Sequence, residues 1–360
     1  MLNDIATHTA PSLPELLDAW RRLREEQPQL RARDLAARLG VSEAELVASR
    51  CGDSVTRLQG PWAELIHALP VLGRVMVLTR NESCVHEKKG SFRNIEIGGA
   101  MGVVLDEAID LRLFLRHWVF GFAVREESRG RWLRSLQFFD GDGRAVHKVY
   151  LTEHSRADEW AGLIGRFAAP VQSPLLELAD VEDPLPRRRG DEAVDVASLR
   201  EHWRRLRDPH DFFAMLKKHE VTRTQALRLA GDEFARRVGD GAMRTVLERA
   251  ATTGLPIMVF VGSPGVVQIH TGPVHDIKTV GPWLNVLDED FNLHLREDHI
   301  AESWVVRKPS PEGQVTSLEL YDAHGGQIAQ CFGKRKPGTP ELADWRALAE
   351  SLPGAEVSHG

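Results

Sequence analysis

The sequence predicts an α+β fold formed by tandem duplication, in which each half is an antiparallel β-sheet flanked by α-helices. One observation is a long internal repeat. The segment VLDEAIDLRLFLRHWVFGFAVR at 104–125 matches VLDEDFNLHLREDHIAESWVVR at 286–307 without gaps. The same offset aligns SLQFFDGDG with SLELYDAHG, and a constant offset over such a span indicates duplication. The other observation is that strand-like segments follow one another through Asp/Gly turns, which is typical of antiparallel sheets.

The same order of elements is predicted in each half: amphipathic helices, then strands, then one closing helix. In the first half the helices are expected at 13–26, 31–40 and 43–50, and the strands at 74–80, 91–97, 118–124, 134–140 and 145–151. The closing helices are expected around Trp160 and Trp345. Prolines and charge runs without sustained periodicity predict a linker, so we expect a first domain at 1–170, a linker at 171–195 and a second domain at 196–360.

Length and composition indicate a globular protein of about two ordinary domains. Hydrophobic residues make up 42% of the 360 residues, charged residues make up 27%, and the formal net charge is -6. An acidic balance argues against general binding to nucleic acid or to anionic membranes. The three cysteines are widely spaced, and no CxxC motif suggests a disulfide framework or a thiolate zinc site. With no signal-peptide pattern at the start and no long apolar run, we expect a cytoplasmic location without stable membrane insertion.

A histidine near a predicted helix start is the first candidate for a functional residue. In LRDPHDFF, Asp208 suits the N-cap and Pro209 suits the first helical position, which places His210 in the first turn. The positive end of the helix dipole disfavours imidazolium, so His210 should be neutral and able to bind a metal. The second copy is also expected to carry extra residues around this histidine, as a functional addition would. The alternative is that the apolar residues after it form only a core stripe (Phe212, Phe213, Met215 and Leu216).

Cationic residues elsewhere in the second half suggest that the ligand bound near His210 also carries carboxylates. Arg223, Lys308 and Arg335 could bind carboxylates, and the phenylalanines near His210 could contact a flat apolar group. Haem combines an iron that binds neutral imidazole with apolar faces and two propionates. These residues are therefore compatible with haem, although they do not require it.

Three other motifs have simpler explanations. Residues 33–50 fit a helix-turn-helix with Gly40 at the turn, but Glu43 and Glu45 would face DNA phosphates, so helical packing is favoured and DNA binding is kept as an alternative. CVHEKKG begins like a zinc-protease helix, but the second histidine is missing and a strand end with a turn is expected around His86. DGDGRAVH and DAHGGQIA resemble calcium loops only in part and are interpreted as hairpin turns.

Long motifs along the chain resemble one protein family. They are LTRNESCVHEKKGSF, IDLRLFLRHW, DPHDFFAMLKKHEVTRTQAL, IMVFVGSPGVVQIHTG, WLNVLDEDFNLHLRE and AESWVVRKPSPEGQVTSLELYDAHGGQIAQCFGKR. Together they are similar to the cytoplasmic haemin transport and haemin-degrading proteins of Gram-negative bacteria, of the HemS, HmuS, ChuS and PhuS type. The resemblance runs from about residue 18 to residue 352 and includes the duplication. It implies two similar halves whose sheets pack centrally.

The resemblance also implies roles for individual residues. His210 would be the ligand of the haem iron, and Arg112, from the other half, would lie on the distal side. Arg223, Lys308, Gln330 and Arg335 would line the pocket and hold propionates or ordered water. His86 matches a histidine linked to a second, weaker haem site, with a structural role as the alternative. Phe332 stands where relatives often have tyrosine, so a hydroxyl is missing from the haem environment.

The function that follows is haem binding in iron acquisition after haem uptake, with haem as the cofactor or cargo. As a carrier, the protein would deliver haem to a haem oxygenase. As an enzyme, it would use oxygen and an external electron donor to degrade haem to a biliverdin-type product, CO and iron, and Arg112 would act on the distal side. Possible partners are a haem oxygenase, a reductase and an inner-membrane haem ABC transporter, whereas nucleic acid is not expected.

Overall fold

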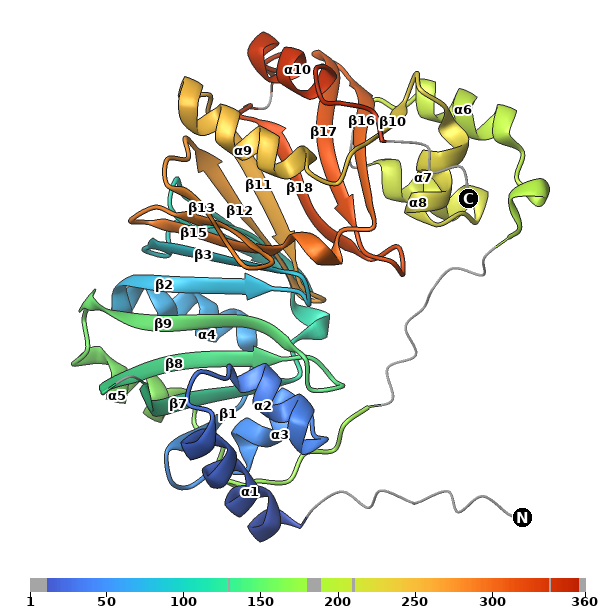
Figure 1. The fold of residues 1–360 in the computed structure, drawn as a ribbon. Helices are drawn as coiled ribbons and strands as arrows, with labels where there is room; N and C mark the ends of the chain where they lie inside the picture. Colours follow the sequence, from blue (N-terminus) through green and yellow to red (C-terminus); the bar gives the residue numbers. More distant parts are fainter. Residues whose placement is uncertain (1–11, 129, 180–188, 209–210, 337, 356–360) are drawn as a thin grey trace, which may run out of the picture. The chain divides into compact units, whose positions relative to one another are not determined.

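The computed structural model describes residues 12–128, 130–179, 189–208, 211–336 and 338–355, and these contain two nine-stranded antiparallel sheets with flanking helices (Figure 1). The first sheet has the strand order β1-β7-β8-β9-β2-β3-β15-β14-β13, and the second has the order β10-β16-β17-β18-β11-β12-β6-β5-β4. The strands of the first half are β1 (Val55–Leu58), β2 (Gly73–Arg80), β3 (Cys84–Gly90), β4 (Ile95–Gly98), β5 (Met101–Leu105), β6 (Asp110–Phe114), β7 (Phe120–Ser128), β8 (Arg131–Phe139) and β9 (Ala145–Ser155). Those of the second half are β10 (Ala235–Val238), β11 (Ile257–Gly262), β12 (Val266–Gly272), β13 (Ile277–Val280), β14 (Trp283–Leu287), β15 (Phe291–Arg296), β16 (Glu302–Ser310), β17 (Gly313–Tyr321) and β18 (Gln327–Gly333). The predicted α+β class is confirmed.

Each sheet combines strands from both halves of the sequence. The order of the first sheet ends in β15-β14-β13 from the second half, and the order of the second sheet ends in β6-β5-β4 from the first half. These two groups are related by the duplication, because β4 begins at Ile95 and β13 begins at Ile277, which is the offset that aligns 104–125 with 286–307. The exchange is therefore reciprocal between the two copies.

Helices precede, interrupt and close each set of strands. They are α1 (Leu13–Glu26), α2 (Ala32–Leu39), α3 (Glu43–Ala48), α4 (Trp62–Ala68), α5 (Glu159–Phe167), α6 (Val196–Arg204), α7 (Phe212–His219), α8 (Arg223–Ala230), α9 (Ala242–Thr253) and α10 (Ala343–Glu350). The helix predicted at 13–26 has these bounds, and the closing helices around Trp160 and Trp345 are α5 and α10. The two predicted Asp/Gly hairpin turns are also confirmed, between β8 and β9 and between β17 and β18.

The helices of the two copies correspond differently from the expectation. Gly40 after α2 and Glu220 after α7 both have left-handed backbone, and Ser42 and Thr222 then cap α3 and α8, so α2 matches α7 and α3 matches α8. With this correspondence, the stretch from Trp203 to the start of α7 is shorter than the equivalent stretch from Trp20 to the start of α2. The prediction of extra residues in the second copy is therefore wrong, because it aligned α8 with α2.

The chain forms two compact units that are not continuous in sequence. The first contains residues 1–77, 91–103 and 113–181, and the second contains 78–90, 104–112 and 182–360. Segments of the first copy thus contribute to the second unit. The boundaries of 1–170, 171–195 and 196–360 follow the duplication and stay a prediction.

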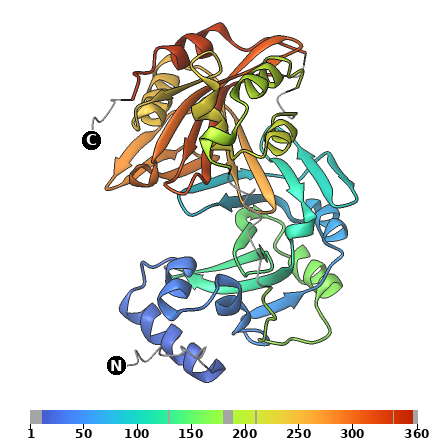
Figure 2. The same ribbon diagram turned by 90° about the vertical axis from the view of Figure 1, so that its right-hand side faces the viewer.

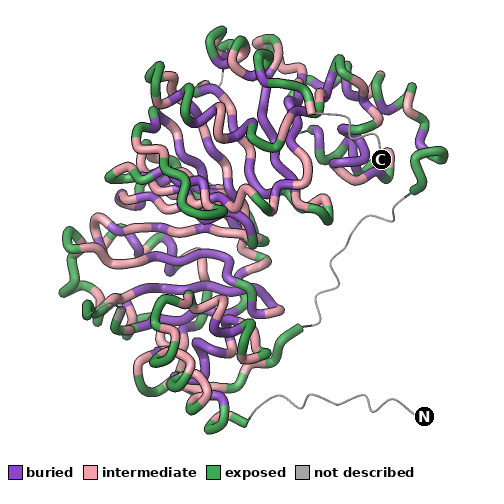
Figure 3. Tube along the Cα trace, in the orientation of Figure 1, coloured by how far each residue is buried: buried purple, intermediate pink, exposed green. Residues whose placement is uncertain are grey.

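In the second unit, the second sheet has a separate core on each face. On one face, the helices α6, α7 and α8 (yellow-green in Figure 2) cover β10, β16 and β17. Trp203, Phe212 and Tyr321 belong to the core between them. On the opposite face, Val259, Leu318 and Cys331 pack with α9, α10 and the strands β3, β14 and β15. Buried and partly exposed residues alternate along several of these strands (Figure 3), so each face is set by the strand period of two.

The helix-turn-helix segment forms as predicted but cannot present a recognition helix. Ser42 accepts a hydrogen bond from the Glu45 backbone N–H at 3.2 Å and caps α3. However, Ala44, Leu46 and Val47 are buried, and the Glu43 side chain is buried in an ion pair with Lys148 at 2.5 Å. A helix that enters a DNA groove needs an exposed face. The DNA-binding alternative is therefore not supported.

No helix of the described residues has both the length and the apolar character needed to span a bilayer.

Candidate functional site

A partly exposed face of β18 and β11, on the side of the second sheet where α7 and α8 pack, forms the candidate site. Gln330 and Phe332 on β18 are partly exposed and alternate with the buried Cys331. The strand register places Phe260 of β11 opposite Gln330 and Met258 opposite Phe332. The register between β17 and β18 places Glu319 opposite Gln330. Directly paired residues share a face, so these side chains form one surface.

This surface has an aromatic part. The rings of Phe260 and Phe332 meet edge to face with centroids 5.0 Å apart. Such a pair is a stable apolar platform, and partial exposure leaves it free to contact a flat ligand. Phe332 supplies no hydroxyl here, whereas the equivalent position in the first copy is Tyr150.

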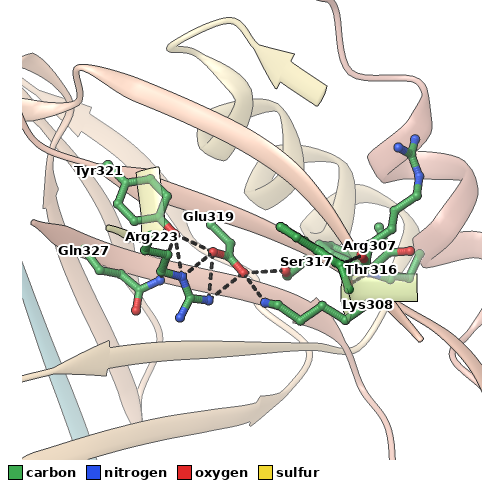
Figure 4. A network of polar contacts seen from close by, with 10 residues as sticks. Arg223, Arg307, Lys308, Thr316, Ser317, Glu319, Tyr321 and Gln327 are labelled. Carbon is green, nitrogen blue, oxygen red and sulfur yellow. Dashed lines mark hydrogen bonds and ion pairs between the residues drawn. The ribbon is translucent and has the colours of Figure 1, made fainter. Parts of the chain in front are cut away.

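A buried ion network is adjacent to the aromatic part and is centred on Glu319 (Figure 4). Arg223, the first residue of α8, donates from Nε and Nη2 to the two Glu319 carboxylate oxygens, each at 2.9 Å. Lys308 Nζ on β16 donates to the same carboxylate at 2.7 Å, and Ser317 Oγ donates at 2.9 Å. The Tyr321 hydroxyl donates at 2.5 Å and accepts from Arg223 Nε at 2.7 Å. The carboxylate therefore has donors from three elements.

Burial and charge compete in this network. Burial alone would raise the pKa of Glu319, but Arg223 and Lys308 lower it well below its ordinary value. Burial lowers the pKa of Lys308 to about 8, with Glu319 opposing the shift. Burial lowers the pKa of Arg223, but the charge of Glu319, the interaction with Tyr321 and the hydrogen bonds to both residues together raise it above its ordinary value. At neutral pH the three groups therefore carry two positive charges and one negative charge, with Lys308 the most readily neutralised.

Phe212 connects this network to the start of α7. Its ring is 4.6 Å from Lys308 Nζ and 5.1 Å from the Arg223 guanidinium carbon, and it meets the Trp203 ring edge to face at 4.6 Å. Cations over an aromatic face are attracted by its quadrupole. Of the two phenylalanines after His210, Phe212 is thus a core residue, whereas Phe213 is 75% exposed.

The helix predicted to begin at Asp208 begins at Phe212, with Asp211 as the N-cap residue. The Asp211 backbone N–H donates to the Asp208 carbonyl at 3.0 Å. Pro209 and His210 lie outside the described residues. The argument that a helix dipole keeps His210 neutral therefore has no structural support, and its ligand role stays a prediction from the resemblance.

Two further predicted residues, Arg335 and Arg112, lie in the second unit and pair with carboxylates outside this network. Arg335, just after β18, is 3.9 Å from a carboxylate oxygen of Glu312, which is a weak ion pair. Arg112 lies on β6 in the same sheet, where its partly exposed guanidinium pairs with Asp110. Of the predicted pocket residues, the structure brings together Arg223, Lys308, Gln330 and Phe332.

His86 lies in the interior of β3, not at the strand end that the sequence suggested. It is fully buried, and its Nδ1 is 2.8 Å from Gln268 Nε2. Gln268 is the residue related to it by the duplication, 182 positions later. Burial, with His270 and Lys88 nearby, lowers the pKa of His86 well below its ordinary value. This geometry favours the structural role, because a buried ring would need to be exposed before it could bind haem.

Sequence reasoning missed Glu319, Tyr321 and Phe260. A signal for the first two exists in the duplicated motifs, where SLQFF at 135–139 becomes SLELY at 317–321. Gln137 and Phe139 of the first copy are thus replaced by a carboxylate and a hydroxyl. Among the described residues, no group of three or more His, Cys, Asp or Glu side chains is placed to hold a metal ion.

Comparison with known proteins shows the family. The model of the haemin-degrading HemS/ChuX domain matches residues 40–167 and again residues 220–352. The haemin transport protein HmuS of Yersinia pestis is 41% identical over 334 residues, covering 92% of this chain and 96% of that protein. The crystal structure of holo-PhuS, a haem-binding protein from Pseudomonas aeruginosa, has a TM-score of 0.93 and 52% identity, covering 96% of this chain and 100% of that one.

A crystal structure described as ChuS, an Escherichia coli haem oxygenase, has a TM-score of 0.85 and 39% identity, covering 94% of this chain and 99% of that one. The duplicated match and the near-complete coverage agree with the predicted resemblance. The chain belongs to the haemin-degrading HemS/ChuX family.

Proposed function

We propose that this protein binds haem in the cytoplasm and holds it for iron acquisition. The observation that carries this proposal is the near-complete likeness to a haem-loaded relative, at 52% identity over 96% of the chain. At that identity, both the fold and most side chains of a ligand site are expected to correspond. The two HmuS and HemS relatives, named as haemin transport proteins, support the same function.

The chemistry of the candidate site fits haem. Phe260 and Phe332 offer an apolar surface for a porphyrin face, and Arg223 offers a charged hydrogen-bond donor for a propionate. Haem needs an axial ligand as well, and we assign this role to His210. Arg112 would lie on the distal side, while Gln330 and Arg335 would complete the pocket wall.

Replacing His210 tests the proposal. His210→Ala should abolish the Soret band of the tight haemin complex because the bond from imidazole to iron is lost. The apo protein should keep its circular dichroism spectrum and denaturation midpoint. His275→Ala, which removes an exposed histidine of the same unit, is the matched control and should bind haemin like wild type. Equal haemin affinity in His210→Ala and wild type would show that the assigned ligand is wrong.

A second function, haem degradation, is favoured by the relative described as a haem oxygenase. The haem complex should be incubated in air with a reductase, a reductant for that reductase and catalase, and the products analysed for biliverdin and carbon monoxide. Catalase removes free peroxide, which can degrade haem without enzymatic control. Product formation under these conditions supports an oxygenase that uses an external electron donor. No product supports a carrier that passes haem to a haem oxygenase, with an inner-membrane haem ABC transporter as the proposed supplier.

A further inference from the structure

The charged network around Glu319 is present in one copy of the fold and replaced in the other. Glu319 corresponds to Gln137 in the first copy, and both side chains are buried. Each makes the same local contact: Gln137 Nε2 donates to Ser135 Oγ at 3.0 Å, and Ser317 Oγ donates to Glu319 at 2.9 Å. The first copy therefore accommodates a neutral amide at the position that Glu319 occupies in the second copy.

A buried carboxylate is costly, so its presence calls for an explanation other than packing. Glu319 is 0% exposed and offsets this cost with donors from Arg223, Lys308, Ser317 and Tyr321. The carboxylate thus holds two cations of different elements at one point. Charged donors that are already fixed in place lose less conformational entropy when a ligand binds.

The geometry of Arg223 shows which of its nitrogen atoms can bind a ligand. Nε and Nη2 are held by Glu319, while the remaining nitrogen, Nη1, makes none of the network's hydrogen bonds (Figure 4). The side chain is 27% exposed, whereas the Lys308 side chain is only 5% exposed. Arg223 can therefore reach a ligand with one edge, and Lys308 supports it from behind.

We propose that Glu319 is a positioning residue of the haem site, which fixes Arg223 with Lys308 behind it so that Arg223 Nη1 receives a carboxylate of the ligand. This inference rests on the proposed haem-binding function. Glu319 does not touch the ligand in this scheme and acts through the two cations. The carboxylate-bearing edge of haem is the part of the ligand that it affects.

The direction of the change in haemin affinity on removing Glu319 distinguishes a positioning role from a purely electrostatic one. If Glu319 acted only as a nearby negative charge, its removal would strengthen binding of an anionic ligand. If it positions the cations, its removal weakens binding, because Arg223 loses both anchoring bonds. Loss of the carboxylate would also lower the pKa of Lys308 further below about 8 and reduce its charge at neutral pH.

The experiment compares haemin with haemin dimethyl ester, which lacks free carboxylates, by titration of the full chain. Glu319→Gln should bind haemin about tenfold more weakly than wild type, because a charge-assisted contact is lost, and should bind the ester with a clearly smaller change. Unchanged or tighter haemin binding overturns the inference. An equal loss for both ligands also overturns it, because that result indicates a general disturbance of the site.

Two further variants complete the test. Glu319→Asp keeps the negative charge but shortens the side chain, so the carboxylate no longer reaches both cations and haemin binding should still weaken. Wild-type affinity would contradict positioning. Glu319→Asp also tests the inference if Glu319→Gln does not fold. Glu341→Gln is the control, since that buried carboxylate accepts hydrogen bonds from Thr316 and Arg346 and not from Arg223 or Lys308, so haemin affinity should be unchanged. Failure of the wild type to bind haemin would instead refute the proposed function.

Discussion

At the scale of single residues, the backbone of β18 passes so close to α10 that residue 333 has room only for glycine. A Cβ atom at Gly333 would lie 2.5 Å from the Trp345 Cβ, and Trp345 is fully buried. The indole also donates to the Thr316 carbonyl at 2.9 Å, so it cannot easily move away. This glycine therefore fixes the strand that carries Gln330 and Phe332.

We expect Gly333→Ala to destabilise the protein by about 1–3 kcal/mol, because an added methyl group overpacks a closed core. The midpoint of urea denaturation, followed by tryptophan fluorescence, measures the change. Gly262→Ala is the control, since its Cβ would lie 3.8 Å from the nearest atoms, an ordinary contact. Equal midpoints for the two variants would contradict this packing argument.

Residue types could be predicted from the sequence where their chemistry is distinctive, but their partners could not. The sequence predicts that Arg223 and Lys308 face a ligand directly, yet both are bound to Glu319. Their partner is 96 positions away from one and 11 from the other, and only the registers of β16 and β17 and the packing of α8 bring them together. Side-chain pairing of this kind depends on tertiary contacts that local sequence does not encode.

At the scale of elements, capping residues mark the helices more reliably than similarity of helical sequence. Ser42 and Thr222 each accept from a backbone N–H three residues later, at 3.2 Å in both cases, and so identify α3 and α8 as equivalent. The Arg- and Ala-rich composition of α2 and α8 suggested a different alignment. Amphipathic helices of similar composition are interchangeable by periodicity, whereas a cap fixes the position of a helix start.

Removing the cap of α3 should therefore have a measurable cost. Ser42→Ala is expected to lower the free energy of unfolding by about 1 kcal/mol, because the Glu45 N–H loses its acceptor. Ser42→Gly should cost only a few tenths of that, since glycine suits an N-cap. Urea midpoints of both variants and wild type give the comparison, and a larger loss for the glycine variant would show that the cap is not the cause.

At the scale of the whole molecule, the class and the duplication could be predicted, but the exchange of strands between the sheets could not. Alternation of apolar residues identifies β4 to β6 and β13 to β15 as strands without indicating which sheet they join. Residues related by the duplication also contact each other in the second unit, between β3 and β12. His86 meets Gln268, and Lys88 meets His270 at 3.3 Å, each pair 182 positions apart.

This arrangement buries histidines that should make the second unit sensitive to acid. Burial lowers the pKa of His270 to about 3, and that of His86 is also well below its ordinary value of 6.5. Between the lowered pKa of each buried histidine and the ordinary value of about 6.5, the unfolded chain binds a proton that the folded chain does not. The free energy of unfolding therefore decreases as pH falls below about 6.5, by up to about 1.4 kcal/mol per pH unit for each histidine. Asp110, whose pKa burial raises by a smaller shift, opposes this only in part.

The first unit is expected to respond less, because two of its groups oppose each other. Burial lowers the pKa of His147 to about 3, but burial also raises the pKa of Asp140 to about 7. From about pH 4 to 7 the folded state holds a proton on Asp140 that the unfolded state lacks, which offsets the proton that His147 does not take up. Acidification to pH 5 should therefore weaken the second unit first.

Hydrogen exchange of the full chain at pH 7 and pH 5, corrected for the intrinsic exchange rate, measures this difference by peptide. We expect protection to fall more in β3, β12 and β15 than in β7, β8 and β9. His270→Gln should reduce the loss in the second unit, since the amide does not titrate, whereas His154→Gln, at an exposed side chain, should leave it unchanged. An equal or greater loss in the first unit would mean that the buried histidines do not control the acid response.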